Sequence, residues 1–127
     1  MARFYLSEIV LGLDYLHFKG ILYRDLKPEN VMIDAQGHVK IADFGISRVG
    51  FFGERERSNT FCGSPEYMCP EMLREDRVHG RCVDIYALGA ILYEMLTGMP
   101  PHYKIGEERI PRDEFYRRIL YDELIYP

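Results

Sequence analysis

Four polar residues in two short segments have types and an order that suit the transfer of a phosphoryl group. Asp25, Lys27 and Asn30 fall within the run Tyr-Arg-Asp-Leu-Lys-Pro-Glu-Asn at 23–30, and Asp43 opens an Asp-Phe-Gly triplet. Magnesium prefers oxygen ligands and takes one or two of them from protein, which Asn30 and Asp43 can supply. Asp25 can orient a hydroxyl group and accept its proton, and Lys27 can neutralise charge on phosphate oxygens.

A predicted β-hairpin between the two segments should bring these four residues together. The apolar runs at 31–33 and 39–41 are separated by the turn residues Asp-Ala-Gln-Gly at 34–37, a pattern typical of a hairpin. A hairpin places its two ends side by side, so we expect the four polar side chains to converge at one spot.

Three segments predict the helices around this hairpin. Residues 4–18 repeat apolar side chains at helical spacing and are followed by Gly20, a suitable C-terminal cap. Residues 82–97 are apolar nearly all round and are stopped by Gly98 and a Pro-Pro pair; a helix of that kind is usually buried on every side. Residues 111–121 predict a further helix, with Pro at its first position and acidic residues in its first turn.

The composition excludes several classes of function. The chain is 47% hydrophobic and 28% charged, as in a globular protein, and its net charge of −4 provides no basic field for nucleic acid or an anionic membrane. The longest apolar stretch, at 85–93, is too short to cross a bilayer. The three cysteines lack a metal-ligand pattern. We expect reduced thiols in an intracellular protein of the cytoplasm, with the nucleus as an open second compartment.

A third segment completes a pattern that resembles the signature of protein kinases. Residues 63–71 read Gly-Ser-Pro-Glu-Tyr-Met-Cys-Pro-Glu, and the order of catalytic loop, Asp-Phe-Gly and Pro-Glu matches that signature almost position for position. Each motif alone would be a weak signal, because such residues more often form caps, turns or surface charges. The joint order and spacing of the three are what make chance an implausible explanation.

The resemblance is closest to the AGC group of Ser/Thr kinases, the relatives of the cyclic-nucleotide-dependent kinases, Akt and the ribosomal S6 kinases. It rests on Tyr23, on the string Thr-Phe-Cys-Gly-Ser-Pro-Glu-Tyr at 60–67 and on Tyr-Glu-Met-Leu-Thr-Gly at 93–98. Lys27 and Ser64 also favour Ser/Thr over Tyr specificity.

The resemblance implies an α+β fold, namely the mainly helical large lobe of a kinase domain with a small β-hairpin, over residues 1–127. This lobe would run from the helix before the catalytic loop to the helix after the activation segment, truncated at both ends. The implied activity is transfer of the γ-phosphate of ATP to Ser/Thr hydroxyls of protein substrates, with ATP and Mg²⁺. The sequence contains no Gly-rich loop and no Val-Ala-Ile-Lys strand. Two alternatives therefore stay open, a non-catalytic kinase-like binding module and a pseudogene fragment.

The same resemblance implies roles for single residues at the nucleotide. Asp25 would be the catalytic base, and Lys27 would contact the γ-phosphate. Asn30 and Asp43 would bind magnesium next to the phosphates, and Met32 would lie beneath the adenine.

Other residues would bind the substrate or support the lobe. Ser64 would help to place the substrate hydroxyl, while Glu29 and Glu94 would face an Arg upstream of the target residue, or would be ordinary solvated acids. Tyr23, Phe44 and Asp84 match positions of the internal packing of kinases, and plain core packing is the alternative for them. Glu71 matches a structural position that would pair with an Arg from beyond the chain.

Thr60 resembles an activation-loop phosphosite. A phosphate there could pair with Arg24 and Arg48 through charge-assisted hydrogen bonds and so order the loop. Because Arg24 adjoins Asp25, that order would reach the catalytic residues. An upstream activating kinase is the partner that this site implies.

Overall fold

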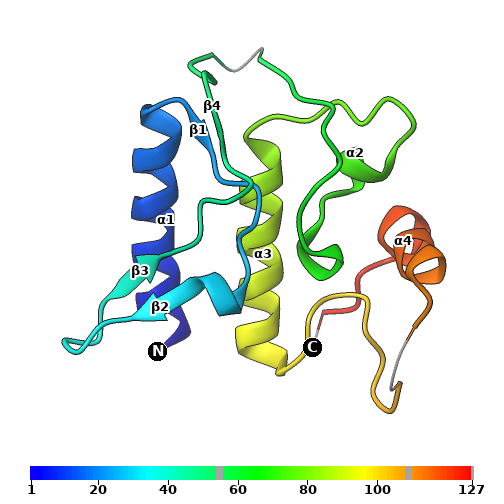
Figure 1. The fold of residues 1–127 in the computed structure, drawn as a ribbon. Coiled ribbons are helices and arrows are strands. Elements are labelled where there is room, and N and C mark those ends of the chain that lie inside the picture. Colours follow the sequence, from blue (N-terminus) through cyan, green and yellow to red (C-terminus); the bar gives the residue numbers. More distant parts are fainter. Residues whose placement is uncertain (54–55, 108–109, 127) are drawn as a thin grey trace.

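Two long helices form the centre of the fold (Figure 1). In the computed structural model, which describes residues 1–53, 56–107 and 110–126, α1 (Ala2–Phe18) contacts α3 (Cys82–Thr97). Apolar side chains of both helices bury one another together with two residues of the segment that runs between them: Ile9, Leu13, Leu16, Ala87, Ala90, Ile91, Tyr23 and Leu26. The predicted α+β fold class is confirmed.

The helix α1 has the amphipathic pattern that its sequence predicts. Ile9, Leu13 and Leu16, spaced at three and four residues, are all buried. The helix begins two residues earlier than predicted, and Gly20 follows it with a φ of +70°. The positive φ favours glycine there, and a Cβ on Gly20 would lie 2.7 Å from the exposed ring of Phe52, which would have to move.

The helix α3 is covered only in part, although its apolar sequence is typical of a helix that is buried on every side. Val83, Ala87 and Ala90 are buried, whereas Ile85 and Leu96 are 56% and 66% exposed. Among the described residues, α1 and η2 (Pro65–Tyr67) supply the main contacts of this helix, and they leave the side of Ile85 and Leu96 uncovered. The predicted C-terminus is confirmed, because Gly98 adopts a φ of +84° and its N–H donates to the carbonyl of Glu94 at 2.8 Å.

The predicted hairpin is confirmed and is attached to α1. β2 (Val31–Ile33) pairs with β3 (Val39–Ile41) in an antiparallel register that joins Val31 to Ile41. One carboxylate oxygen of Glu8 accepts a hydrogen bond from the Val39 N–H at 2.7 Å, and the other contacts Nδ1 of His38 at 2.6 Å. These bonds hold the hairpin against the helix.

A second small sheet is absent from the sequence-based prediction. β1 (Ile21–Leu22) pairs with β4 (Arg48–Val49), and the two strands are too short to show an alternating pattern. Their pairing returns the chain after the Asp-Phe-Gly triplet to the segment that enters the catalytic loop. Arg48 pairs with Leu22 in this sheet, two residues before Arg24.

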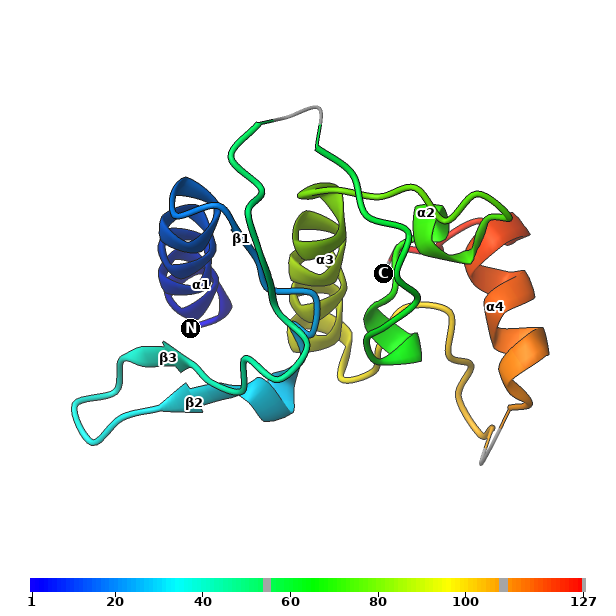
Figure 2. The same ribbon diagram turned by 45° about the horizontal axis from the view of Figure 1, so that its top comes forward.

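The C-terminal half packs on the other side of α3. Both views place α3 between α1 and α4 (Arg112–Tyr121) (Figure 2). The short helix α2 (Pro70–Leu73) contacts α4, and a second apolar cluster forms from Met68, Cys69, Met72 and Val83. The predicted helix at 111–121 is confirmed, with Pro111 at its N-cap rather than inside it. In the part of the chain that is described, no helix is long and apolar enough to span a membrane.

One buried carboxylate joins α3 to α1 and to the loop that follows α1. Asp84 is 0% exposed. Its Oδ2 accepts the Tyr23 N–H at 3.0 Å and lies 2.6 Å from Nε2 of His17, and its Oδ1 accepts the Arg24 N–H at 2.8 Å. A buried charge is tolerated only when such hydrogen bonds satisfy it.

Replacing this carboxylate should destabilise the whole protein. Asp84→Ala leaves the imidazole of His17 and two backbone N–H groups buried without their acceptor, so we expect the free energy of unfolding to fall by about 3–5 kcal/mol. Urea unfolding measures this change, with Asp76→Ala at an exposed aspartate as the control. Equal stability of the two variants would contradict the role assigned to Asp84.

Candidate functional site

The carboxylate of Asp25 is the centre of a hydrogen-bonded network. Its Oδ1 accepts the hydroxyl of Ser64 at 3.1 Å, and its Oδ2 accepts Nδ2 of Asn30 at 3.1 Å. Nζ of Lys27 lies 3.2 Å from Oδ2 and donates to the Ser64 hydroxyl at 3.0 Å. The fold thus joins three residues of one loop to a fourth that lies 34 positions after Asn30 in the sequence.

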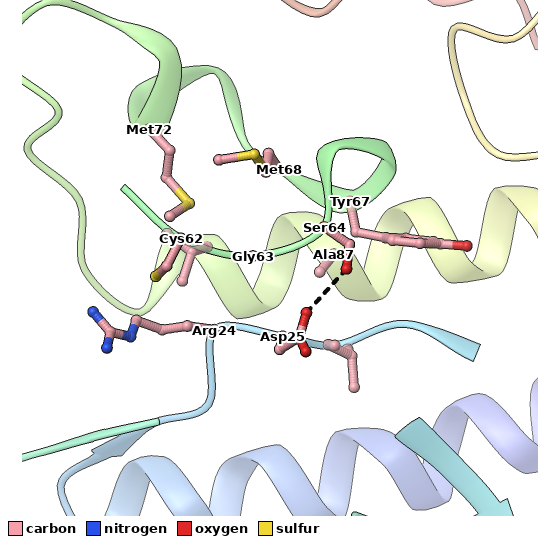
Figure 3. A pocket seen from close by; sticks show the side chains of 11 residues that line it. Arg24, Asp25, Cys62, Gly63, Ser64, Tyr67, Met68, Met72 and Ala87 are labelled. Carbon is pink, nitrogen blue, oxygen red and sulfur yellow. Dashed lines mark hydrogen bonds between the residues drawn. The ribbon is translucent and has the colours of Figure 1, made fainter. Parts of the chain in front are cut away.

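The network lies at the edge of a small cavity and stays accessible. The side chains of Asp25 and Lys27 are 14% and 25% exposed. Figure 3 shows the Asp25 carboxylate turned toward Ser64, while the Arg24 side chain extends away from it. The cavity is lined by both segments and by α3, including Asp25, Leu26, Gly63, Ser64, Tyr67 and Ala87.

Gly63 allows the close approach of the two segments. It has a φ of +102°, and a Cβ at this position would lie 2.9 Å from the carbonyl oxygen of Arg24. Real Cβ atoms do not come so close to a backbone oxygen, so only glycine permits Ser64 to reach Asp25.

Asp43 lies next to this network without bonding to it. The N–H of Ala42 donates to the carbonyl of Asn30 at 2.9 Å, which brings the start of the Asp-Phe-Gly triplet beside the catalytic loop. The Asp43 backbone has a φ of +60°, and its exposed carboxylate accepts the N–H of Gly45 at 3.0 Å. Of the four residues expected to converge, three are directly bonded and Asp43 is their neighbour.

The oxygen atoms of Asn30 and Asp43 fit a magnesium ion that is shared with phosphates. Nδ2 of Asn30 is committed to the carbonyl and the carboxylate of Asp25, so its Oδ1 is left to accept or to coordinate. Within the described residues no group of three or more His, Cys, Asp or Glu could hold a metal. Two protein oxygens suffice for magnesium only when phosphate and water supply the rest.

Met32 lies on β2 opposite Lys40, and 55% of its surface is exposed. It therefore offers an apolar contact on the surface of the hairpin, and its role under an adenine stays a prediction.

Tyr23 and Phe44 connect the catalytic loop to the Asp-Phe-Gly triplet. Tyr23 is fully buried, and its hydroxyl donates to the carbonyl of Ala42. Burial raises the pKa of Tyr23 to about 12, so the side chain stays a neutral donor. Its ring packs edge-on against the half-exposed ring of Phe44, with 5.3 Å between the ring centroids.

The two acids proposed for substrate binding lie near one tyrosine, which the sequence reasoning missed. The hydroxyl of Tyr67 donates to Oε2 of Glu94 at 2.6 Å. Burial raises the pKa of Tyr67, and the charges of Glu94 and Glu29 raise it further. Tyr67 lies inside a motif string, but its type gave no indication that its partner would come from α3.

Thr60 is exposed, as a phosphosite must be, and within the described residues neither of its expected partners, Arg24 and Arg48, forms a hydrogen bond to it. Nε and Nη2 of Arg24 donate to the carbonyl of Ile46 at 2.8 and 2.6 Å. Nη1 of Arg48 donates to the hydroxyl of Ser58 at 3.0 Å, and the Thr60 N–H contacts that same hydroxyl at 3.4 Å. Ser58, which the sequence reasoning also missed, therefore links Thr60 to Arg48.

Glu71 interacts locally, with the thiol of the buried Cys69. Burial, with this carboxylate, raises the pKa of Cys69 to about 12, so the thiol is inert rather than nucleophilic. The expected pairing of Glu71 with an Arg from outside the chain stays a prediction.

Comparison with known proteins matches residues 1–123 to the protein kinase domain family. Serine/threonine-protein kinase Sgk2 of Homo sapiens is 46% identical over 126 residues, which are 99% of this chain and 32% of that protein. RAC-beta serine/threonine-protein kinase of Rattus norvegicus is 46% identical over 126 residues, 99% of this chain and 25% of that protein.

Ribosomal protein S6 kinase beta of Caenorhabditis elegans is 54% identical over 101 residues, 80% of this chain and 18% of that protein. The chain thus spans at most 32% of the length of these relatives. With the family match over 1–123 and the motifs in place around Asp25, the chain belongs to the protein kinase family, within the AGC group of serine/threonine kinases.

Proposed function

We propose that the protein transfers the γ-phosphate of ATP to Ser and Thr hydroxyls of protein substrates, with Asp25 as the catalytic base. Kinases of this family use ATP and Mg²⁺. The observation that carries the proposal is the network in which Asp25 is bonded to Lys27, Asn30 and Ser64. A residue released from catalysis would have no need of three polar partners at the edge of an open cavity.

Each member of the network has a task in this reaction. The Asn30 amide and the Lys27 ammonium hold one Asp25 oxygen, which leaves the other oriented toward the position of the Ser64 hydroxyl. A substrate hydroxyl that displaces Ser64 from this oxygen would give its proton to Asp25 as the phosphoryl group leaves ATP. Lys27 offsets the negative charge of that group, and a bound magnesium ion would add to this charge stabilisation.

Removing the base should abolish transfer without unfolding the protein. In the full-length protein, Asp25→Asn keeps an oxygen for Ser64 but cannot accept a proton, so we expect kcat to fall by about 10²- to 10⁴-fold. Transfer of labelled phosphate from ATP to a peptide measures this, with Asp76→Asn as the control.

Asp43→Asn in the same assay should raise the magnesium concentration needed for half-maximal rate.

If the full-length protein without substitutions binds peptide but transfers no phosphate, the binding-module alternative is favoured. Unchanged kcat in Asp25→Asn would remove Asp25 from the reaction.

We propose that the substrates carry an Arg upstream of the target residue. The charges of both Glu94 and Glu29 raise the pKa of Tyr67, after burial and the hydrogen bond to Glu94, which indicates that both acids lie on its side of the lobe. A carboxylate there suits the bidentate donors of a guanidinium group. The hydroxyl of Tyr67 holds Glu94 in place, which reduces the entropy lost when the substrate binds.

Neutralising Glu94 should reduce this preference. For Glu94→Gln we expect kcat/KM to fall by about tenfold or more on peptides with the upstream Arg, because a charge-assisted pair is lost, and to change little on peptides with Ala there. A peptide array read for both variants measures the ratio. Glu123→Gln, at an exposed glutamate, is the control, and equal ratios in all three proteins would contradict the proposal.

We propose that an upstream kinase activates the protein by phosphorylating Thr60, and that this takes place in the cytoplasm. The exposure of Thr60 supports access, and its link through Ser58 to Arg48 supports a connection to β4. Arg24, next to Asp25, is the residue through which order in this loop would reach the base.

Preventing this modification should lower activity. Thr60→Ala in the full-length protein should reduce kcat by at least about tenfold when the protein is isolated from cells that phosphorylate it, since one to three charge-assisted hydrogen bonds are lost. Asn59→Ala, at the exposed neighbour, is the control. Full activity of Thr60→Ala would show that the loop is ordered without phosphate.

A further inference from the structure

A buried histidine outside the catalytic network has one ring nitrogen without a partner. His79 is 1% exposed, and its Nδ1 lies 2.7 Å from the carbonyl of Arg77, where only a protonated Nδ1 can donate. Its Nε2 is buried and has no hydrogen-bond partner among the described residues. In the neutral ring this nitrogen carries a lone pair and can only accept.

The backbone brings this histidine to the phosphosite segment. The N–H of Ser58 donates to the His79 carbonyl at 2.7 Å, and the N–H of His79 donates to the Ser58 carbonyl at 2.9 Å. Residues paired directly in this antiparallel way direct their side chains to the same face. The hydroxyl of Ser58 accepts Nη1 of Arg48 and contacts the Thr60 N–H. The Ser58 hydroxyl thus contacts Arg48 and the Thr60 N–H, while the backbone pairing places the His79 side chain on the same face as that of Ser58.

The surroundings of the imidazole are mainly cationic. Burial lowers the pKa of His79, and the charges of Arg24 and Arg48 lower it further, against the opposing effects of the Arg77 carbonyl and of Glu71. Nη1 of Arg24 is also buried without a partner among the described residues. Arg57 lies against Gly80, the residue after His79. The unpaired Arg24 donor and the surrounding cations suit an anion, which the His79 Nε2 could bind once it carries a proton.

We propose that His79 is a third ligand, beside Arg24 and Arg48, for a phosphate on Thr60, and that its Nε2 takes up one proton from solvent when the phosphate arrives. The inference rests on the proposed role of Thr60. Because the Nδ1 proton is committed to the Arg77 carbonyl, Nε2 becomes a donor only in the imidazolium form. The charge of a phosphate, about −1.5 to −2 at pH 7, reverses the cationic field that opposes this protonation.

Ser58 would hold Arg48 until then. Its hydroxyl occupies one guanidinium donor in the unmodified protein, and a phosphate oxygen is the stronger acceptor for the same donor. Phosphorylation would thus exchange a bond from Arg48 to a neutral acceptor for bonds from Arg48, Arg24 and His79 to an anionic one.

The direct test follows the protonation of His79 by NMR. The full chain is labelled at histidine Cε1 and prepared with threonine or genetically encoded phosphothreonine at position 60, and its four histidines are assigned by substitution. We expect the pKa of His79 to be below the usual histidine range without phosphate, and its proton affinity to rise by about tenfold or more with phosphate. The exposed His38 is the control, and its signals should be the same in both forms. Identical titration of His79 in both forms would overturn the proposal.

A second measurement tests the ligand role by variants of the phosphorylated full-length protein. His79→Phe removes the donor, so we expect a phosphatase to release phosphate from Thr60 about tenfold faster, with a smaller effect for His79→Gln, which keeps an amide donor. His38→Gln is the matched control. Equal release rates for all four proteins would contradict the proposal. Neither readout requires kinase activity, so a protein without phosphotransfer activity would refute the proposed function and leave this test standing.

Discussion

The buried carboxylate of Asp84 accepts hydrogen bonds from a helix, α1, and from two successive backbone N–H groups at the entry to the catalytic loop. The loop enters the space between the two long helices at this point. Arg24 takes a φ of +69°, a costly conformation for a residue with a side chain, and the bond from its own N–H to Asp84 helps to hold it there. Asp25 follows directly, so the position of the base depends on a charge that never reaches solvent.

Two groups of polar contacts extend in opposite directions from this anchored turn. Asp25 turns toward Ser64, whereas the Arg24 side chain extends away from it (Figure 3). The Arg24 guanidinium donates to the Ile46 carbonyl. Burial and then the charge of Arg24 lower the pKa of His79. Because Arg24 and Asp25 are adjacent in the chain, displacement of one moves the backbone of the other. This is a physical route by which a charge near Thr60 can influence the base, and it requires no rearrangement of the helices. The two-residue strands β1 and β4 pair close to this turn and keep the segment of Arg48 beside it.

The sequence predicted the long elements well and the short ones poorly. Helix α1, the hairpin and α4 carry periodic patterns or turn residues over enough positions to be recognised, while the two-residue strands β1 and β4 and the four-residue helix α2 do not. The pattern of α3 was recognised, but the sequence did not indicate which of its residues are covered. An apolar sequence reports what a helix can bury, and the packing of its neighbours decides which residues are covered, as the exposure of Ile85 and Leu96 illustrates.

For the candidate site, the sequence by itself determined the chemical types and the family, because Asp25, Lys27, Asn30 and Asp43 stand in a motif order that few unrelated chains would share. Only the tertiary structure decided which groups bond. It joined Ser64 to Asp25 and Tyr67 to Glu94, and it brought His79 to Ser58, two residues before Thr60. These partners lie 21–39 positions apart in the sequence, and no local pattern encodes such a contact. The packing of the chain between the helices sets these distances, and through them the protonation and reactivity of each group.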